Sequence, residues 1–306
     1  MNEHAYFESD WMQSLMRGEQ PSDKSLREHL LSVHRNHPGF AESCALKCRN
    51  SSGHNSYELL ASIIDPKRHS RILDLACGSG VLLEVCQQRF GPSSELTGVD
   101  MSPEELALAR QRNPHLKNNL HLGVAQNLDF IGDDYFDVIL CHWALTLMDK
   151  VPLVLREAKR VLKKNGVFAA IVDGDPKSAP GYAELHNIIY SFVKQQCPDY
   201  GKTDLGDRRV REGVSLRQLA KQTFTDAEIK IEPLLFYLNA TPDVLAREVA
   251  GFFYASFVMA PQAQAYMLEQ LERFFAKQGD GNQSRFSLPV NKLVVCLSPE
   301  IDRGQD

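Results

Sequence analysis

Long apolar runs are absent from this chain of 306 residues, of which 43% are hydrophobic and 24% charged. No stretch approaches the ~20 uninterrupted apolar residues that a membrane-spanning helix requires. The chain opens with polar and acidic residues, whereas a secretory signal needs a basic start followed by an apolar run. The sequence therefore predicts a cytoplasmic protein with no membrane partner. Its length suits one large core with a substantial addition, or two small domains.

Cysteine is too scarce for a disulfide scaffold, with seven in the whole chain. Cys44 and Cys48 stand four residues apart and could place two thiolates on one face of a helix. No second Cys or His pair follows at the spacing that would complete a tetrahedral zinc site. We therefore predict no metal site.

A basic stripe of the kind that follows a phosphate backbone is also missing. The formal net charge is −5, and the two signs are mixed along the chain. This argues against nucleic acid as a partner. Three arginines, Arg208, Arg209 and Arg211, form either a solvated loop or a contact for an anionic substrate.

From residue 71 onward, short apolar segments alternate with helical stretches. Seven segments suit strands: residues 71–76, 95–99, 120–124, 136–141, 167–172, 228–238 and 292–297. Strand–helix alternation at this spacing is typical of a parallel sheet with helices on both faces. The predicted fold is α/β, a doubly wound, mostly parallel seven-stranded Rossmann-like sheet with a helical cap.

The same pattern divides the chain into four segments. Residues 1–66 read as amphipathic helices that form an N-terminal cap segment, ended by Asp65 and Pro66. Residues 67–175 form the cofactor-binding core. Residues 176–227 are a helical insertion that contributes to the cap, and residues 228–306 return to the core sheet with further cap helices.

The turn after the first strand carries the most information. Gly78 and Gly80 allow a backbone to pass close to a ligand and to adopt positive φ. A nicotinamide-binding fingerprint would place a third glycine at position 83, which is Leu83, and a phosphate-binding P-loop ending is also absent. Asp100, twenty positions after Gly80, ends the second strand and could accept both hydroxyls of a ribose. Together these features predict a cofactor that contains adenosine.

A helix is predicted to begin directly after Asp100. Ser102 is a favourable N-cap, Pro103 suits the first helical position, and Glu105 would complete a capping box.

Residues 73–80, which read L-D-L-A-C-G-S-G, resemble the first motif of class I (Rossmann-like) S-adenosylmethionine (SAM)-dependent methyltransferases. That motif is an acidic residue followed by G-x-G-x-G, and Ala76 stands in place of its first glycine. Residues 123–130 and 136–145 resemble the third-strand and fourth-strand segments of the family. The resemblance covers residues 56–175 and favours the small-molecule, type 11-like branch.

The resemblance implies SAM as cofactor, with S-adenosylhomocysteine as its product, and a small-molecule methyl acceptor attacked in line. By resemblance, Gly78 and Gly80 lie against the methionine part and the ribose, Asp100 holds the ribose hydroxyls, and Asp74 reaches the cofactor amine. Val124 stands where an Asp is frequent, so Ala125 or Gln126 would meet the adenine. The predicted cofactor site comprises Asp74, Ala76, Cys77, Gly78, Gly80, Asp100, Met101, Ala125, Gln126, Asn127 and His142.

Acceptor and catalytic residues follow less directly from the sequence. His142 comes right after the fourth strand and is either a satisfied strand-end histidine or a general base for an amine or hydroxyl acceptor. Tyr182, His186 and Tyr190 are spaced four apart and share one helical face. They either border the core, or Tyr182 and His186 contact the substrate.

Two other functions compete with methyl transfer. A SAM-binding sensor or scaffold without turnover would carry the same turn. A nicotinamide-dependent oxidoreductase is disfavoured by Leu83. The segment after the fourth strand also lacks an Asn-Pro-Pro-Tyr signature and a Pro-Cys nucleophile, which favours a small molecule over nucleic acid as acceptor. The sequence predicts neither the acceptor nor the oligomeric state.

Overall fold

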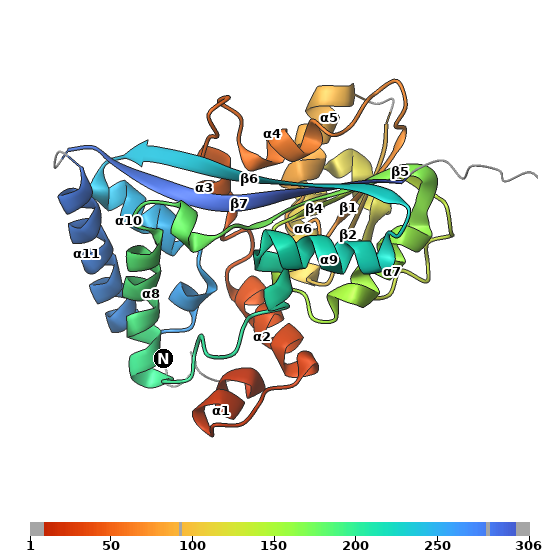
Figure 1. Ribbon diagram of the computed structural model, residues 1–306. Helices are drawn as coiled ribbons and strands as arrows, with labels where there is room; N and C mark the ends of the chain where they lie inside the picture. The colour runs from red at the N-terminus through yellow and green to blue at the C-terminus, as the bar shows by residue number, and fades with distance from the viewer. Residues whose placement is uncertain (1–8, 92–93, 280–281, 298–306) are drawn as a thin grey trace, which may run out of the picture.

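A seven-stranded sheet forms the centre of the computed structural model, which describes residues 9–91, 94–279 and 282–297 (Figure 1). Its strand order is β3-β2-β1-β4-β5-β7-β6. Neighbouring strands among β1 to β5 pair in parallel, and β7 runs antiparallel to β5 and β6. The predicted doubly wound, mostly parallel seven-stranded sheet is confirmed. The strands are β1 (Arg71–Leu75), β2 (Glu95–Asp100), β3 (Leu120–Leu122), β4 (Phe136–His142), β5 (Leu162–Asp173), β6 (Ala227–Ala240) and β7 (Ser284–Leu297).

Helices precede, connect and follow these strands. Before β1 come α1 (Asp10–Met16), α2 (Asp23–Asn36), α3 (Glu42–Lys47) and α4 (Ser56–Ala61). The connections between the parallel strands contain α5 (Val81–Phe90), α6 (Pro103–Arg112) and α7 (Val151–Val161). Later in the chain come α8 (Tyr182–Gln196), α9 (Gly213–Thr223), α10 (Pro242–Ala250) and α11 (Pro261–Gln278).

Two hydrophobic cores cover the two faces of the sheet. Successive strand residues point to opposite faces, and Ile72 of β1 belongs to a different buried cluster from Leu73. The cluster of Ile72 includes apolar residues of α4, α5 and α6, and it continues into the helices of the cap. The cluster of Leu73 includes α7 and α9. The sheet is therefore buried on both sides, which explains the unbroken apolar run of β5.

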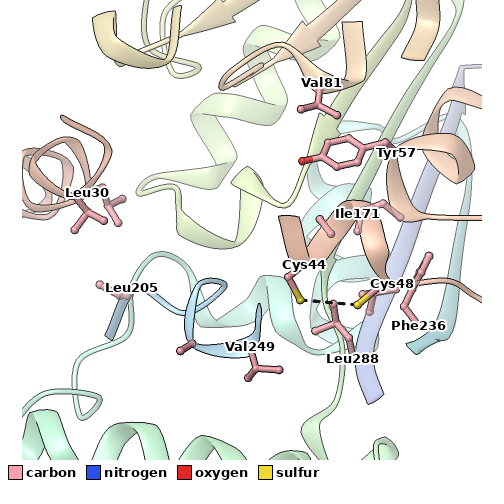
Figure 2. Packing of buried hydrophobic residues seen from close by; sticks show 14 of the residues in the cluster. Leu30, Cys44, Cys48, Tyr57, Val81, Ile171, Leu205, Phe236, Val249 and Leu288 are labelled. Carbon is pink, nitrogen blue, oxygen red and sulfur yellow. Dashed lines mark hydrogen bonds between the residues drawn. The ribbon is translucent and has the colours of Figure 1, made fainter. Parts of the chain in front are cut away.

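Strands β6 and β7 form a long antiparallel pair that reaches beyond the core toward α8, α10 and α11 (Figure 1). The prediction for β7, residues 292–297, was too short because buried polar residues, such as Ser287 and Asn291, interrupt the apolar pattern of its first half. Phe286, Leu288 and Val290 alternate with other residues there and do not form a continuous apolar run. Cys44 and Cys48 belong to the same buried cluster as Phe286, with their Sγ atoms 3.9 Å apart (Figure 2).

Three further boundaries differ from the prediction. β3 ends at Leu122 because the chain turns soon afterwards, where the backbone N–H of Asn127 donates to the carbonyl of Val124 at 3.0 Å. β5 begins at Leu162, five residues early, and the register shifts between Phe136 and Val138 where it pairs with β4. Helix α9, assigned to the cap, instead packs against α7 and β6 on the core sheet. The other domain boundaries stay predictions.

The described part of the chain contains no helix that is both long and apolar enough to cross a membrane. Within the same residues, no group of three or more His, Cys, Asp or Glu side chains is arranged to hold a metal ion. The polar opening segment, residues 1–8, lies outside the described residues, and a cytoplasmic location stays a prediction.

Asp137 of β4 joins three strands at the edge of the sheet where β1 and β5 begin. Its carboxylate accepts hydrogen bonds from the backbone N–H groups of Ser70 and Arg71, each at 2.9 Å, and from Nζ of Lys163 at 2.7 Å. Burial opposes ionisation, but these donors outweigh it and lower the pKa of Asp137 from 3.8 to about 2. The ionised carboxylate therefore stabilises the fold.

We predict that Asp137→Asn lowers the free energy of unfolding at pH 7 by about 2 kcal/mol. Because the folded-state pKa is depressed, this stabilisation is complete above the ordinary pKa and is lost as the pH falls through about 2. Urea unfolding at pH 7, 4 and 3 should therefore show the difference between wild type and variant shrinking. Asp226→Asn, which removes an exposed carboxylate, is the control. A difference independent of pH would contradict the assignment.

Candidate active site

A cavity of about 450 Å³ lies at the carboxyl ends of the parallel strands, between the core and the cap helices. In open α/β sheets, ligands bind at this edge, and the volume is within the ~300–1,000 Å³ of small-molecule sites. Its walls come from the turn after β1, the ends of β2, β4 and β5, the amino-terminal helices and α8. The cavity is thus shared between the core and segments on both sides of it in sequence.

Most of the predicted site residues line this one cavity. They are Asp74, Ala76, Cys77, Gly78, Asp100, Met101, Ala125, Gln126 and His142 of the predicted cofactor site, with Tyr182 and His186 of the predicted substrate site. The structure therefore places the two predicted sites in one continuous space.

Two predicted cofactor residues do not line the cavity. A Cβ on Gly80 would meet Nδ2 of Asn113 at 2.6 Å and Cβ of Ala109 at 3.0 Å, so this glycine allows α6 to pack closely. The side chain of Asn127 is exposed and bonds to Asp129 in its own turn. The cofactor roles of these two residues stay predictions, because motif position alone does not tell on which side of a turn a residue faces.

The turn after β1 holds Ala76 and Gly78 in the left-handed region, with φ of 61° and 51°. The backbone N–H of Gly78 donates to Oδ2 of Asp100 at 2.8 Å, which fixes the turn against the end of β2. A Cβ on Gly78 would meet one protein atom, Oε2 of Glu105, at 3.8 Å. The open side of this glycine therefore belongs to the cavity.

Asp74 lies beneath this turn, 2% exposed, and neither carboxylate oxygen has a hydrogen-bond partner among the described residues. Burial, and then the nearby charge of Asp100, raises the pKa of Asp74 well above its usual range. Buried polar atoms in native proteins are almost always hydrogen-bonded. An orphaned carboxylate beside a cavity therefore fits a ligand that brings donors or positive charge.

The capping box predicted after Asp100 is only half formed. Oγ of Ser102 accepts from the backbone N–H of Glu105 at 3.2 Å, as predicted, but the N–H of Ser102 donates to Asp100 at 2.8 Å. The carboxylate of Glu105 turns away and accepts from the backbone N–H of Gly39 at 2.8 Å. It also bonds to Nδ1 of His34 at 2.7 Å. Glu105 thus connects the amino-terminal segment to the start of α6.

His142 is held by two residues of α4. Its Nε2 lies 2.9 Å from Oγ of Ser56, and its ring stacks on Tyr57 with centroids 3.8 Å apart and an interplanar angle of 22°. Burial lowers the pKa of His142 to about 3. The imidazole is therefore neutral at physiological pH and is a weak proton acceptor.

Aromatic side chains form the half of the cavity remote from the glycine turn. His186 stacks on Tyr190 with centroids 3.9 Å apart, and Tyr190 in turn contacts Tyr200. Tyr200 is 1% exposed and its hydroxyl has no partner among the described residues. Trp11 of α1 packs edge-on against Tyr200. We call this set, with Tyr182, the aromatic chamber.

Arg211 enters the cavity wall between two carboxylates. Its guanidinium lies 3.4 Å from Asp173 and 3.6 Å from Asp204. Nε1 of Trp143 also donates to Asp173, at 3.1 Å. Asp173 and Asp204 balance the charge of Arg211, but its buried Nη1 has no hydrogen-bond partner among the described residues, so contact with an anionic substrate stays a hypothesis. Arg209 pairs locally with Asp207.

Sequence reasoning missed several lining residues because long-range packing brings them here. Tyr57 reads as a core residue of an amphipathic helix, and the expected capping role of Glu105 concealed its contact with Gly39. Acidic residues predominate in the lining: Glu42, Asp74, Asp100, Glu105, Asp149, Asp173 and Asp204, against Arg27 and Arg211. The site therefore suits a ligand that carries positive charge and several donors.

Comparison with known proteins agrees with this geometry. Residues 73–170 match a family described as a methyltransferase domain. The demethylmenaquinone methyltransferase of Staphylococcus haemolyticus is 30% identical over 135 residues, 44% of this chain and 54% of that protein. The protein of the same name from Staphylococcus epidermidis is 25% identical over 191 residues, 62% of this chain and 75% of that protein. The chain thus spans about half the length of the first of these relatives.

Among solved structures, the YcgJ protein of Bacillus subtilis has the same fold, with a TM-score of 0.52 and 19% identity. The likeness covers 79% of this chain and 97% of that one.

We predict that Ala76→Gly raises the free energy of unfolding by about 0.5–1 kcal/mol. A Cβ in the left-handed region costs about 1–2 kcal/mol, part of which is offset by the greater freedom of glycine in the unfolded chain. Gly78→Ala is the matched opposite change and should destabilise the fold by about 1–2 kcal/mol. Chemical unfolding measures both, and a destabilised Ala76→Gly would show that the turn is not strained.

Proposed function

We propose that this chain is a class I methyltransferase that transfers a methyl group from SAM to a small-molecule acceptor, and that residues 73–170, which match a methyltransferase domain, bind the SAM. The observation that carries the proposal is the single cavity, which joins the glycine turn and Asp74 to the aromatic chamber. Donor and acceptor could therefore meet inside it.

The residues present fit SAM. The open side of Gly78 leaves room for the methionine part, the orphaned carboxylate of Asp74 would accept from its ammonium group, and Asp100 would accept from the ribose hydroxyls. SAM when bound supplies an electrophilic methyl group on a positively charged sulfur. The excess of carboxylates in the lining favours a cation at this place.

The contribution of the chain to the reaction is mainly positioning. An acceptor atom held in line with the methyl group at near-attack distance gains several of the ~7–11 kcal/mol that good alignment can supply. The stack of His142 on Tyr57 fixes one wall between the two halves of the cavity. In this proposal His142 shapes the transfer point, because an imidazole with a pKa of about 3 makes a poor general base at neutral pH.

The aromatic chamber supports an acceptor with an apolar, ring-shaped body. Tyr182, Tyr190, Tyr200 and Trp11 offer ring faces and edges, and the carboxylates of Asp173 and Asp204 beside Arg211 oppose an anionic acceptor. Aromatic pairs gain about 0.5–1.5 kcal/mol beyond the area they bury. The names of the two curated relatives refer to demethylmenaquinone, which belongs to the same chemical class.

A SAM-binding sensor without turnover remains the competing function. A sensor requires only the part of the cavity beside the glycine turn and Asp74, and it gives no role to the aromatic chamber. A nicotinamide oxidoreductase is the weaker candidate, since Leu83 is buried in α5 where the third glycine would stand. Radiolabelled methyl transfer to a panel of quinols and simple phenols distinguishes enzyme from sensor.

We predict that S-adenosylhomocysteine binds and stabilises this protein, by linkage to the folded state. Asp100→Ala should weaken binding by about 1.5–3 kcal/mol, the value of a hydrogen bond to a charged group. Calorimetry measures the affinity, with Asp226→Asn as the control. Unchanged affinity in Asp100→Ala would remove this carboxylate from the cofactor site, and a greater stabilisation by NAD would favour the oxidoreductase.

We predict that Tyr182→Phe and His186→Ala each lower methyl transfer at least tenfold, about 1.4 kcal/mol, while SAM affinity holds. Both side chains belong to the aromatic chamber, and neither belongs to the glycine turn. Single-turnover transfer and calorimetry on the same samples measure the two quantities. Full activity in both variants would place the acceptor contacts on the amino-terminal helices, where Trp11 and Tyr57 lie.

A further inference from the structure

The part of the cavity beside the glycine turn and Asp74, the donor half, is lined by residues that follow successive strands of the sheet. The glycine turn comes after β1, Asp100 ends β2, and Val124 and Gln126 follow β3, which is the next strand outward. A nucleoside whose ribose is held at Asp100 and whose tail lies over the glycine turn therefore extends its base toward the end of β3. The side chain of Val124 offers no hydrogen-bond acceptor there.

A carboxylate from another part of the chain lies at this end. Asp149 stands just before α7, far from β3 in sequence, yet its Oδ1 accepts from Nε2 of Gln126 at 3.0 Å. The same Nε2 donates to the backbone carbonyl of Asp149 at 2.9 Å. Gln126 thus fixes both the backbone and the side chain of Asp149 beside the end of β3.

The second oxygen of Asp149 is unused. The side chain is 3% exposed, and Oδ2 has no hydrogen-bond partner among the described residues. Nε of Arg27, on α2, lies 3.7 Å from the other oxygen, Oδ1. Since Asp149 and Gln126 both line the cavity, this unpaired acceptor lies in the wall beside the end of β3, where the base would lie. Leaving such a group unpaired destabilises the fold, and a donor on the ligand would recover that stability.

We propose that Asp149 reads the exocyclic amino group of the cofactor's purine base, in place of an acceptor at position 124. Gln126 is its positioning residue. The inference rests on the proposed SAM-dependent function, and it deepens that function by naming the group that distinguishes adenine from a 6-oxopurine.

Adenine and hypoxanthine differ at this position in whether the base donates or accepts a hydrogen bond. The amino group of adenine donates a hydrogen bond to a carboxylate. Hypoxanthine has an oxygen at the same position, which is an acceptor and repels a carboxylate. An asparagine at position 149 could instead donate its amide to that oxygen. Replacing Asp149 by Asn should therefore change the preference between the two bases as well as the overall affinity.

The test is calorimetric binding of S-adenosylhomocysteine and of its deaminated analogue, S-inosylhomocysteine, which needs no acceptor and no turnover. We expect wild type to bind the adenine ligand at least tenfold more tightly. Asp149→Asn should reduce this ratio to threefold or less, through weaker adenine binding and equal or tighter inosine binding. Asp149→Ser, which removes the carboxylate without adding bulk, should also lose the preference.

A reverse change serves as the matched control. Val124→Asp in the Asp149→Asn background returns a carboxylate to this end of the cavity and should restore part of the adenine preference. An equal loss of affinity for both ligands in Asp149→Asn would mean a structural role only and would overturn the inference. So would a full adenine preference in both Asp149 variants. Failure of wild type to bind either ligand would overturn the proposed donor, and this inference with it.

Discussion

Buried negative charge is the constraint on which this structure depends. The cavity lining contains seven carboxylates and two arginines, and each buried carboxylate needs a donor or must be protonated. The fold supplies backbone N–H groups to Asp100, His34 and Gly39 to Glu105, and Gln126 to Asp149. It supplies none to Asp74 among the described residues. The glycine turn, the amino-terminal segment and the loop before α7 are each joined to a neighbouring segment by one of these hydrogen bonds.

The parts of the site that could be predicted from sequence are the local ones. A glycine at positive φ and an acid at a strand end are determined by a few neighbouring residues, so Gly78 and Asp100 were placed correctly in the cavity. Gly80 and Asn127 were not, because the same short motif has two sides and only packing against Asn113 or Asp129 shows which side faces out. The order of helices and strands also depends on local sequence patterns, so the type of sheet could be predicted.

The rest depends on contacts across the chain, which leave no local pattern. Glu105 was predicted to cap its own helix, and in the structure it instead contacts Gly39, 66 residues earlier. Tyr57 was assigned no role from the sequence, and in the structure its ring stacks on His142 at the end of β4. The length of β7 was likewise underestimated, because buried Ser and Asn residues interrupt the apolar pattern of its first half.

The amino-terminal arm is attached to the rest of the protein unlike any other wall of the cavity. Helices α8, α10 and α11 pack against the antiparallel pair β6–β7, and β7 pairs with β5 of the main sheet. Among the described backbone hydrogen bonds, those that join residues 9–49 to later segments are the two between Arg49 and Tyr237, at 2.9 and 2.7 Å. Everything before that bridge is held by side chains, such as His34 on Glu105 and Arg27 near Asp149. Residues 9–48 are therefore held against the sheet and the cap by packing, through buried side chains such as Trp11, Leu30 and Cys44, and not by strand pairing.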